Sequence, residues 1–316
     1  MSFSSLWGSL PVRGTEIAGH WDQLYIFLFY LSVFFFLLVT GAMLLFAVKY
    51  RKGTGGQTSG IHENVKLEIL WTVIPTVLVM GIFVWGYHVF HQMIQAPAGA
   101  MEVRVIARQW SWLFVYDDGR RSTDLYVPVN VPVKLIMSSE DVLHSFFVPD
   151  FRVKQDVVPG RYTNLWFQAT ISGEHPIFCA EFCGAAHSAM LSKVVALNDV
   201  EWKAWKQQKE NSGQTGGGGD PILKGKRLTE LKGCVGCHSG DGSKRIGPTY
   251  KGLYGSEKEF SDGSKGVADE TYLKESIENP QAKIVKGYEG INMPTFKGQF
   301  SEEEFMALMA YFKSLK

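Results

Sequence analysis

The chain has 316 residues, enough for two or three domains of ordinary size. Its 32 Lys and Arg nearly balance its 31 Asp and Glu, and a formal charge of +1 argues against a nucleic-acid partner. Four cysteines are too few for a scaffold held by disulfides, and they form two tight pairs, Cys179/Cys183 and Cys234/Cys237, whose spacing indicates metal or cofactor chemistry. Apolar residues gather near the N-terminus, which excludes a purely soluble cytosolic protein.

Two apolar runs predict a pair of transmembrane helices at about 24–48 and 68–92, within an N-terminal region of residues 1–96. The first run has no charge and is long enough to cross a hydrocarbon core of about 30 Å. It is too long for a cleaved signal peptide and has no basic region before it. The loop between the runs is rich in Lys and Arg, whereas the first 23 residues contain only Arg13. The loop is therefore expected on the cytoplasmic side, with everything after about residue 92 outside.

Residues 97–206 change to an alternating pattern typical of half-buried strands. Val103, Val105 and Ala107 alternate with mainly polar neighbours. Further strands are expected at 132–137, 142–148, 162–169 and 190–197, with turn residues between them. Short strands at this spacing predict an antiparallel sandwich or barrel.

The chemistry of this region is concentrated in one stretch that contains Cys179, Cys183, His187 and Met190. Two thiolates, an imidazole and a thioether form a soft ligand set that suits copper. A mononuclear blue-copper site needs one thiolate, so the second implies two bridging thiolates and two metals. A second imidazole must then come from elsewhere, and His144 is the best placed. The alternative is a structural disulfide with His187 and Met190 as bystanders.

Residues 207–221 are polar and rich in glycine, a composition typical of a flexible tether. After this tether, residues 222–316 contain Cys234-Val-Gly-Cys237-His238, the attachment motif of a c-type haem. A thioredoxin-like pair or half of a zinc site would be the alternatives, but no second C-x-x-C is present for zinc.

The rest of this C-terminal region predicts a small helical domain. Short helices are expected at 223–232, from Asp269 to Pro280, and after the capping box that begins at Ser301. Met293, Met306 and Met309 are candidates for the sixth ligand of the haem iron. Only Met293 lies in a loop that is free to reach the iron, and ligation by His238 and Met293 would favour electron transfer over oxygen binding.

The copper motif resembles that of cytochrome c oxidase subunit II. The resemblance rests on Leu143-His144-Ser-Phe and on Cys179-x-Glu181-x-x-x-His187 with Met190, and it extends from the membrane hairpin to about residue 205. It implies a cupredoxin-type Greek-key sandwich with a dinuclear copper A centre bridged by Cys179 and Cys183. By the same resemblance, His144 and Met190 complete one copper, and His187 and the Glu181 carbonyl oxygen complete the other.

Three further residues acquire expected roles from this resemblance. Trp110, in Gln-Trp-Ser-Trp, would be an electron relay, although Ser111 occupies a position that is usually aromatic in the family. The Glu181 carboxylate would help to bind magnesium at the interface with subunit I; an ordinary exposed loop carboxylate is the alternative. Glu68, three residues before Trp71, would mark the entrance of a proton channel into subunit I, or be a simple interfacial charge.

The C-terminal segment resembles an all-α class I cytochrome c, in which Gly247-Pro248 matches the turn that accepts the proximal imidazole N–H. Together the resemblances imply subunit II of a caa-type, proton-pumping haem–copper oxidase. Electrons would enter at the haem c and pass through copper A to subunit I, where oxygen is reduced. The chain alone would be an electron-transfer component. Its partners would be subunit I, subunit III, and a respiratory cytochrome or quinol–cytochrome c reductase, at the bacterial inner membrane with both cofactor domains on the periplasmic side.

Three other functions fit these residues less well. A quinol oxidase subunit on the same scaffold would lack the copper ligands, all of which are present. A membrane-anchored copper chaperone would place its cysteine pair after the first strand of a thioredoxin-like fold. A free-standing redox carrier or sensor would not need the paired membrane helices and Glu68.

Overall fold

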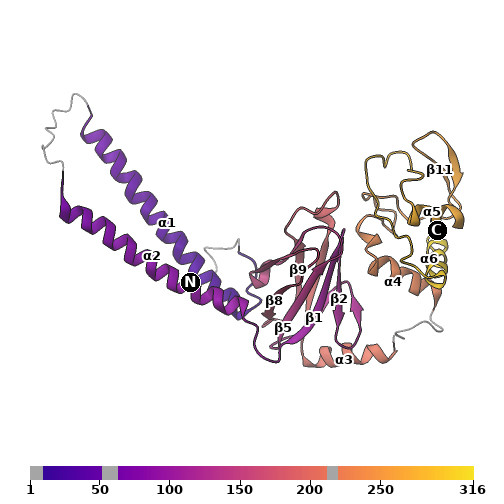
Figure 1. Cartoon of the computed structure of the whole chain (residues 1–316), viewed down its shortest axis with the longest axis horizontal. Helices are drawn as coiled ribbons and strands as arrows, with labels where there is room; N and C mark the ends of the chain where they lie inside the picture. The colour runs from indigo at the N-terminus through magenta and orange to yellow at the C-terminus, as the bar shows by residue number, and fades with distance from the viewer. Residues whose placement is uncertain (1–9, 52–62, 212–219) are drawn as a thin grey trace. The chain divides into compact units, whose positions relative to one another are not determined.

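The computed structural model describes residues 10–51, 63–211 and 220–316. The chain forms two compact units, one of residues 15–95 and one that joins residues 10–14 to residues 96–316 (Figure 1). Part of the basic loop between the helices and most of the expected tether, residues 52–62 and 212–219, lie outside the described residues.

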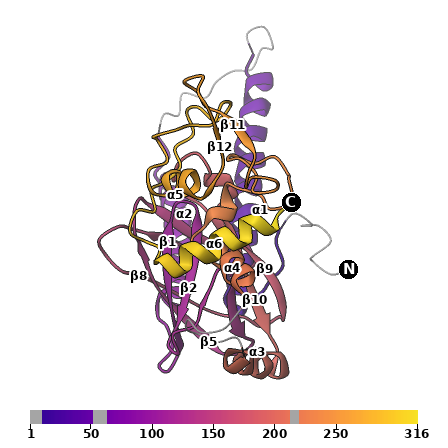
Figure 2. The ribbon, with the colours of Figure 1, turned by 90° about the vertical axis from the view of Figure 1, so that its right-hand side faces the viewer.

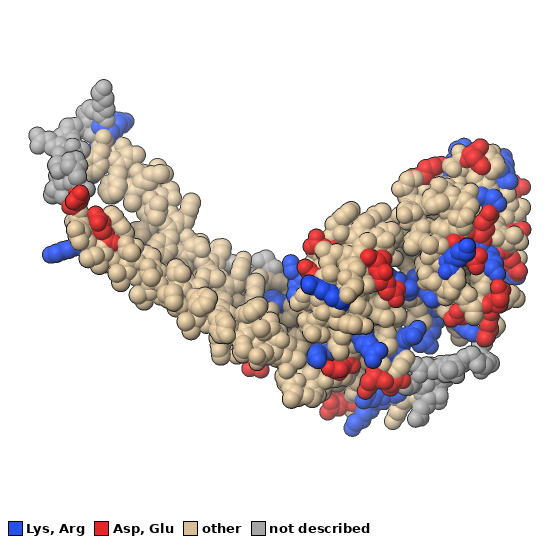
Figure 3. All heavy atoms as spheres, in the orientation of Figure 1, with Lys and Arg blue, Asp and Glu red and all other residues tan. Residues whose placement is uncertain are grey.

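The first unit is a hairpin of two long helices, α1 (Glu16–Lys49) and α2 (Val65–Ile94). Both are long and apolar enough to cross a membrane, and their central windows are not buried in the protein. Figure 3 shows almost no charged atoms along the described sides of these helices. The helix α1 begins earlier than the apolar run, because the Thr15 hydroxyl accepts a hydrogen bond from Ala18 N and caps its first turn. The predicted membrane hairpin is therefore confirmed as a pair of candidate spans.

The second unit contains a β-sandwich of two five-stranded sheets (Figures 1 and 2). One sheet has the order β3-β2-β1-β5-β8 and the other the order β4-β10-β9-β6-β7. The first sheet consists of β1 (Met101–Arg108), β2 (Ser111–Tyr116), β3 (Arg121–Ser122), β5 (Pro132–Ser139) and β8 (Thr163–Gln168). The second consists of β4 (Leu125–Pro128), β6 (His144–Val148), β7 (Val153–Val157), β9 (Gly173–Cys179) and β10 (Leu191–Leu197).

The strands expected from alternation are present as β1, β5, β6, β8 and β10, whereas β2, β3, β4, β7 and β9 were missed. The predicted β-sandwich is confirmed, and most of its strand pairs are antiparallel, but β1 pairs with β5, and β4 with β10, in parallel. These pairs form because the chain crosses between the sheets before it returns. Alternate side chains of β1, from Val103 to Ala107, are fully buried between the sheets. Trp112 and Phe146 meet edge to face in the same core, with ring centroids 5.4 Å apart.

The helix α3 (Asp199–Asn211) follows the sandwich and is fixed to it by an aromatic group. The Arg120 guanidinium lies 3.8 Å from the ring centroid of Trp205 and donates to the carbonyl oxygens of Trp205 and Lys206. Trp205 also stacks on Tyr126. This group holds the middle of α3 against the sandwich, and the helix continues through residues 207–211, which the sequence assigned to the tether.

The C-terminal domain is built on α4 (Pro221–Leu231), α5 (Glu270–Glu278) and α6 (Glu302–Ser314). A 3-10 turn, η4 (Cys234–Gly236), follows α4, and a short hairpin pairs β11 (Glu257–Glu259) with β12 (Lys265–Val267). The capping box at Ser301 and Glu304 is present, as predicted. Helices α4 and α6 cross (Figure 2). They are closest at Gly225, where a Cβ would collide with the carbonyl group of Ala307. Only glycine allows these two backbones to approach so closely.

Candidate copper and haem centres

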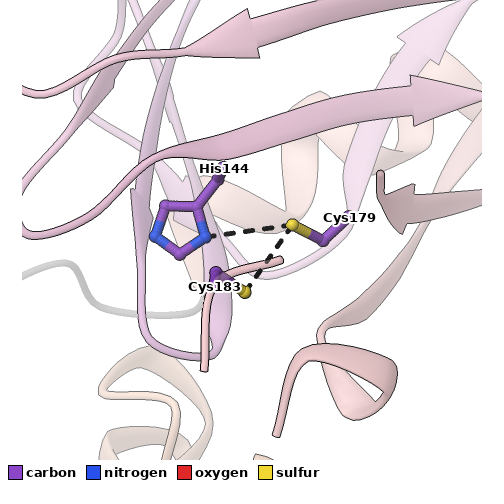
Figure 4. A group of neighbouring side chains, drawn as sticks. All are labelled: His144, Cys179 and Cys183. Carbon is purple, nitrogen blue, oxygen red and sulfur yellow. Dashed lines mark hydrogen bonds between the residues drawn. The ribbon is translucent and has the colours of Figure 1, made fainter. Parts of the chain in front are cut away.

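A pair of free cysteines forms the centre of the candidate copper site (Figure 4). Cys179 is the last residue of β9, and Cys183 lies in the loop that follows. Their Sγ atoms are 3.7 Å apart, and both side chains are buried. Together with His144 they form a group of metal-ligand atoms that lie within 4.8 Å of one another. Two thiols held side by side in this way fit a pair of bridging thiolates.

The remaining expected donors surround the two sulfur atoms. His144 Nδ1 lies 3.9 Å and the Glu181 carbonyl oxygen 3.2 Å from Cys179 Sγ. His187 Nδ1 lies 3.4 Å and Met190 Sδ 3.9 Å from Cys183 Sγ. The structure therefore brings together every residue predicted to bind copper. This closed set of sulfur, imidazole and carbonyl donors fits a dinuclear copper centre.

The sheet and one glycine determine this arrangement. Strand β6 lies beside β9, and Phe146 is paired with Cys179, so that His144 at the start of β6 approaches the cysteine. After Cys183 the chain turns at Gly184, whose φ is +116°. A Cβ on Gly184 would lie 2.9 Å from Gln109 Nε2 and 3.1 Å from Trp110 Cζ2. The missing side chain lets both residues donate hydrogen bonds to the Cys183 carbonyl oxygen, Gln109 Nε2 at 2.8 Å and Trp110 Nε1 at 3.2 Å.

Asp141 belongs to this site and was missed by the sequence reasoning. Its carboxylate accepts hydrogen bonds from His144 Nε2 at 2.9 Å and from the Gln109 backbone N–H at 2.7 Å. The first bond directs the Nδ1 lone pair of His144 toward the sulfur, as carboxylates commonly do for metal-binding histidines. Burial raises the pKa of Asp141, but the bonds from His144 and the backbone outweigh it and the pKa is lowered. The signal in the sequence was the position of Asp141, a carboxylate three residues before the expected metal ligand His144.

The two thiols differ in acidity. Burial raises the pKa of Cys179, but its hydrogen bonds with His144 and with the backbone of Ser145 and Glu181 outweigh burial and lower the pKa to about 6. Burial, and then the negative charge of Cys179, raise the pKa of Cys183 to about 12. The metal-free pair therefore retains one proton at neutral pH, and metal binding must displace it.

The haem-attachment motif lies directly after α4. Cys234 begins η4, and His238 follows Cys237. His238 Nδ1 donates to the Pro248 carbonyl oxygen at 2.7 Å, which leaves Nε2 available for an iron. Burial lowers the pKa of His238, with the bond to Pro248 acting in the opposite direction, so the imidazole stays neutral as a ligand must. A Cβ on Gly247 would lie 2.7 Å from the His238 ring, so glycine is needed there.

A cavity lined mainly by apolar side chains joins this motif to the loop expected to supply the sixth ligand. Its lining includes Cys234, Cys237, His238 and Met293. Met309 is buried in the helical core, and Met306 is exposed on α6, so neither lines the cavity. The donors and the apolar lining therefore fit a covalently attached haem, whose iron His238 and Met293 would hold.

The other residues singled out from the sequence have simpler surroundings. Trp110 is buried and lines the haem cavity as well as contacting the copper loop. The Glu181 side chain is exposed beside the copper site, and Glu68 is exposed in the first turn of α2. The expected roles of all three in electron relay, magnesium binding and proton uptake stay predictions.

Comparisons with known proteins agree with the two sites. Family models match three parts of the chain: the transmembrane domain of cytochrome c oxidase subunit II at residues 9–89, its periplasmic domain at 120–197, and cytochrome c at 222–316. Cytochrome c oxidase subunit 2 of Alkalihalophilus pseudofirmus is 31% identical, and the alignment covers 89% of this chain and 82% of that protein.

Two further similar proteins have the same description. Cytochrome c oxidase subunit 2 of a Synechocystis species is 31% identical over 64% of this chain and 77% of its own length. Among solved structures, the periplasmic domain of subunit II of cytochrome oxidase from Bradyrhizobium japonicum is 27% identical, covers 37% of this chain and 98% of its own, and has a TM-score of 0.35. With its membrane hairpin, its thiol-centred metal site and its haem-attachment domain, this chain belongs to the cytochrome c oxidase subunit II family.

Proposed function

We propose that the chain receives electrons at its haem domain and delivers them through its copper domain to subunit I of a proton-pumping oxidase. The observation that supports this most strongly is the single cluster in which His144, Glu181, His187, Met190 and both cysteines converge. A haem-attachment site in the same compact unit supplies the first half of the electron route.

The protein's contribution at the copper site is to hold the donors rigidly and to exclude water. When bound, a bridged pair of coppers shares one electron, so that each metal–ligand bond changes little between the two redox states. His144 and Met190 are fully buried, so these two ligands would hold the metals away from water. Asp141 orients the His144 ring by a hydrogen bond, and the Trp110 indole N–H donates a hydrogen bond to the Cys183 carbonyl oxygen. A rigid, dry site of this kind favours electron transfer over ligand exchange.

The haem domain would hold the haem iron with His238 and Met293 inside a mainly apolar pocket. When bound, a haem with His and Met ligands has a raised potential and no open coordination position for oxygen. His238 is oriented by Pro248, and Met293 lines the same cavity. The donor to this domain is a respiratory cytochrome or quinol–cytochrome c reductase.

The same proposal gives the location of the chain and its neighbouring subunits. The hairpin anchors the chain in the bacterial inner membrane beside subunits I and III, with the copper and haem domains on the periplasmic side. The exposed Glu181 carboxylate contributes to a magnesium site at the boundary with subunit I, because carboxylate oxygens suit that ion.

Glu68 is proposed as the entrance of a proton channel into subunit I. It is exposed in the first turn of α2, beside the basic loop expected on the cytoplasmic side. Glu68→Gln should lower proton pumping and turnover in the reconstituted oxidase, while Glu63→Gln, an exposed carboxylate just before α2, serves as the control. Unchanged pumping and turnover in Glu68→Gln would discard the role.

The main test uses the intact oxidase complex. After rapid photoreduction of the haem domain, we expect the haem to be reoxidised as the copper band changes, followed by oxygen uptake. Cys183→Ser should abolish the dinuclear copper signal and leave the haem reduced, whereas Ser188→Ala, an exposed change in the same loop, should behave as wild type. Rapid haem reoxidation in Cys183→Ser, or copper that is lost when the protein is reduced, would contradict the proposal and favour a copper carrier.

A further inference from the structure

The haem-attachment segment contacts the sandwich at the residues around Trp110. These residues, from Arg108 at the end of β1 to Ser111 at the start of β2, are called here the docking corner. Both partners belong to the same compact unit of the chain. Cys237 and Ile246 pack against the core cluster that includes Trp110. The contact therefore involves the haem-attachment loop itself and not a remote face of the helical domain.

Arg108 supplies the polar part of this contact. Its guanidinium donates a hydrogen bond of 2.5 Å to the carbonyl oxygen of Leu231, the last residue of α4. Carbonyl groups in the last turn of a helix have no partner within the helix, and they lie at its negative end. A guanidinium is therefore the favoured partner for this position. The Glu140 carboxylate, 3.9 Å away, pairs with the same guanidinium.

Ser111 and Gly233, two small residues from different domains, approach each other closely. A Cβ on Gly233 would lie 2.5 Å from Ser111 Oγ and 2.8 Å from Ser111 Cβ. Gly233 also has a φ of +75°, a conformation that favours glycine at the end of a helix. Ser111 is the residue that departs from the aromatic pattern of the family. A large ring at this position would occupy the space that the attachment segment now fills.

Trp110 lies between these two contacts. A Cβ on Gly236 would lie 3.3 Å from the Trp110 carbonyl oxygen, and the Trp110 side chain lines the haem cavity. Only 6% of Trp110 is exposed. On its other side, the indole N–H is bonded to the Cys183 carbonyl. The same residue thus touches both the haem-attachment segment and the copper loop.

We propose that Arg108 and Ser111 are positioning residues that dock the chain's own haem domain over Trp110, so that an external electron donor cannot reach the copper site directly. This inference rests on the proposed function. It also explains why a serine stands at position 111, where the family usually has an aromatic residue. In the docked state the electron leaves the haem domain, which is oxidised, and reduces the copper domain by way of Trp110, with no proton or bond involved.

The test compares four variants of the intact oxidase. Arg108→Ala removes the hydrogen bond to Leu231, and Arg108→Lys restores a donor without the planar fork. Ser111→Tyr restores the family's aromatic residue and should displace the haem domain without harming the sandwich. Arg104→Ala, an exposed residue on the same face of β1, is the matched control.

Oxidative footprinting by mass spectrometry measures the exposure of Trp110, with the core residue Trp112 as internal reference. We expect oxidation of Trp110 to rise about tenfold in Arg108→Ala and in Ser111→Tyr, consistent with the loss of a charge-assisted contact. Arg108→Lys should be intermediate and Arg104→Ala unchanged. A soluble reduced cytochrome c should reduce copper directly only in the two disrupted variants, while their copper EPR spectra stay as in wild type.

Two results would overturn the inference. One is rapid oxidation of Trp110 in the wild-type complex, and the other is no change in either disrupted variant. Both would leave the proposed function standing if the wild-type complex still contains copper A and haem c and passes electrons between them. Loss of the copper signal in the wild type would instead remove the proposed function itself.

Discussion

The copper and haem sites are built in opposite ways within one compact unit. The copper donors lie at strand ends and in one tight loop, beside a core of the sandwich that is continuous without any metal. The haem donors line a cavity between short helices and loops. The apolar side chains that line this cavity would pack against the haem. An empty apolar cavity is costly to maintain, because its lining side chains lose their packing contacts. We therefore expect the sandwich to fold before its metals bind and the haem domain to depend on its haem.

The largest expected effect comes from removing the haem attachment. In the double variant Cys234→Ser and Cys237→Ser, the haem domain should lose its cooperative unfolding transition, because its cavity has no occupant. Thermal unfolding followed by circular dichroism measures this in the full chain, and copper EPR measures the sandwich separately. A haem domain that still unfolds cooperatively in this variant would contradict the claim that this domain, unlike the sandwich, depends on its cofactor to fold.

The next effect concerns the crossing of α4 and α6. Gly225→Val should destabilise the haem domain by about 3 kcal/mol, because the added side chain would collide with the Ala307 backbone. Denaturant unfolding detected by haem absorption measures the change, and Lys226→Ala, exposed on the same helix, is the control. The copper centre should be unaffected, and an equal loss of copper would show that the two domains do not fold separately.

A smaller effect is expected when the copper site loses the support of a carboxylate. Asp141→Ala removes the partner of His144 Nε2 and should weaken copper binding by about 10–100-fold, as is usual for residues that orient a metal ligand. Competition with a copper chelator measures the affinity, and Asp117→Ala in the exposed turn after β2 is the control. The sandwich should keep its unfolding temperature without copper, since its core is complete.

The smallest effect is a dependence of copper binding on pH. Because the pKa of Cys179 is about 6 and that of Cys183 about 12, copper displaces about one proton from the thiol pair between these values. Apparent copper affinity should therefore rise about tenfold for each pH unit from 7 to 9, and fall as the solution is acidified. Titration with copper in weakly chelating buffers tests this, and an affinity independent of pH would show that both thiols are already ionised.

The sequence predicted those parts of the molecule whose signals are local. The ligands from Cys179 to Met190, the haem motif and the capping box at Ser301 each lie within a short stretch of chain. Strand β9, which positions Cys179, was missed because Pro176 interrupts its pattern. A proline weakens a strand assignment even where, as here, neighbouring residues still pair.

Contacts between distant segments could not be predicted in this way. The bond between Asp141 and the Gln109 backbone joins two loops, and the contact between Arg108 and Leu231 joins two domains. Gly225 also appeared unremarkable in the sequence, because only the crossing with α6 shows why no side chain fits there. Each of these depends on the tertiary fold, which determines the partners of a residue far along the chain.

The most direct test of the account is the metal content and copper EPR spectrum of the full-length chain, purified in detergent after haem maturation and copper loading. We predict two coppers for each haem iron, with hyperfine coupling shared equally over two copper nuclei. A single copper for each iron, with coupling to one nucleus, would contradict a dinuclear centre bridged by Cys179 and Cys183.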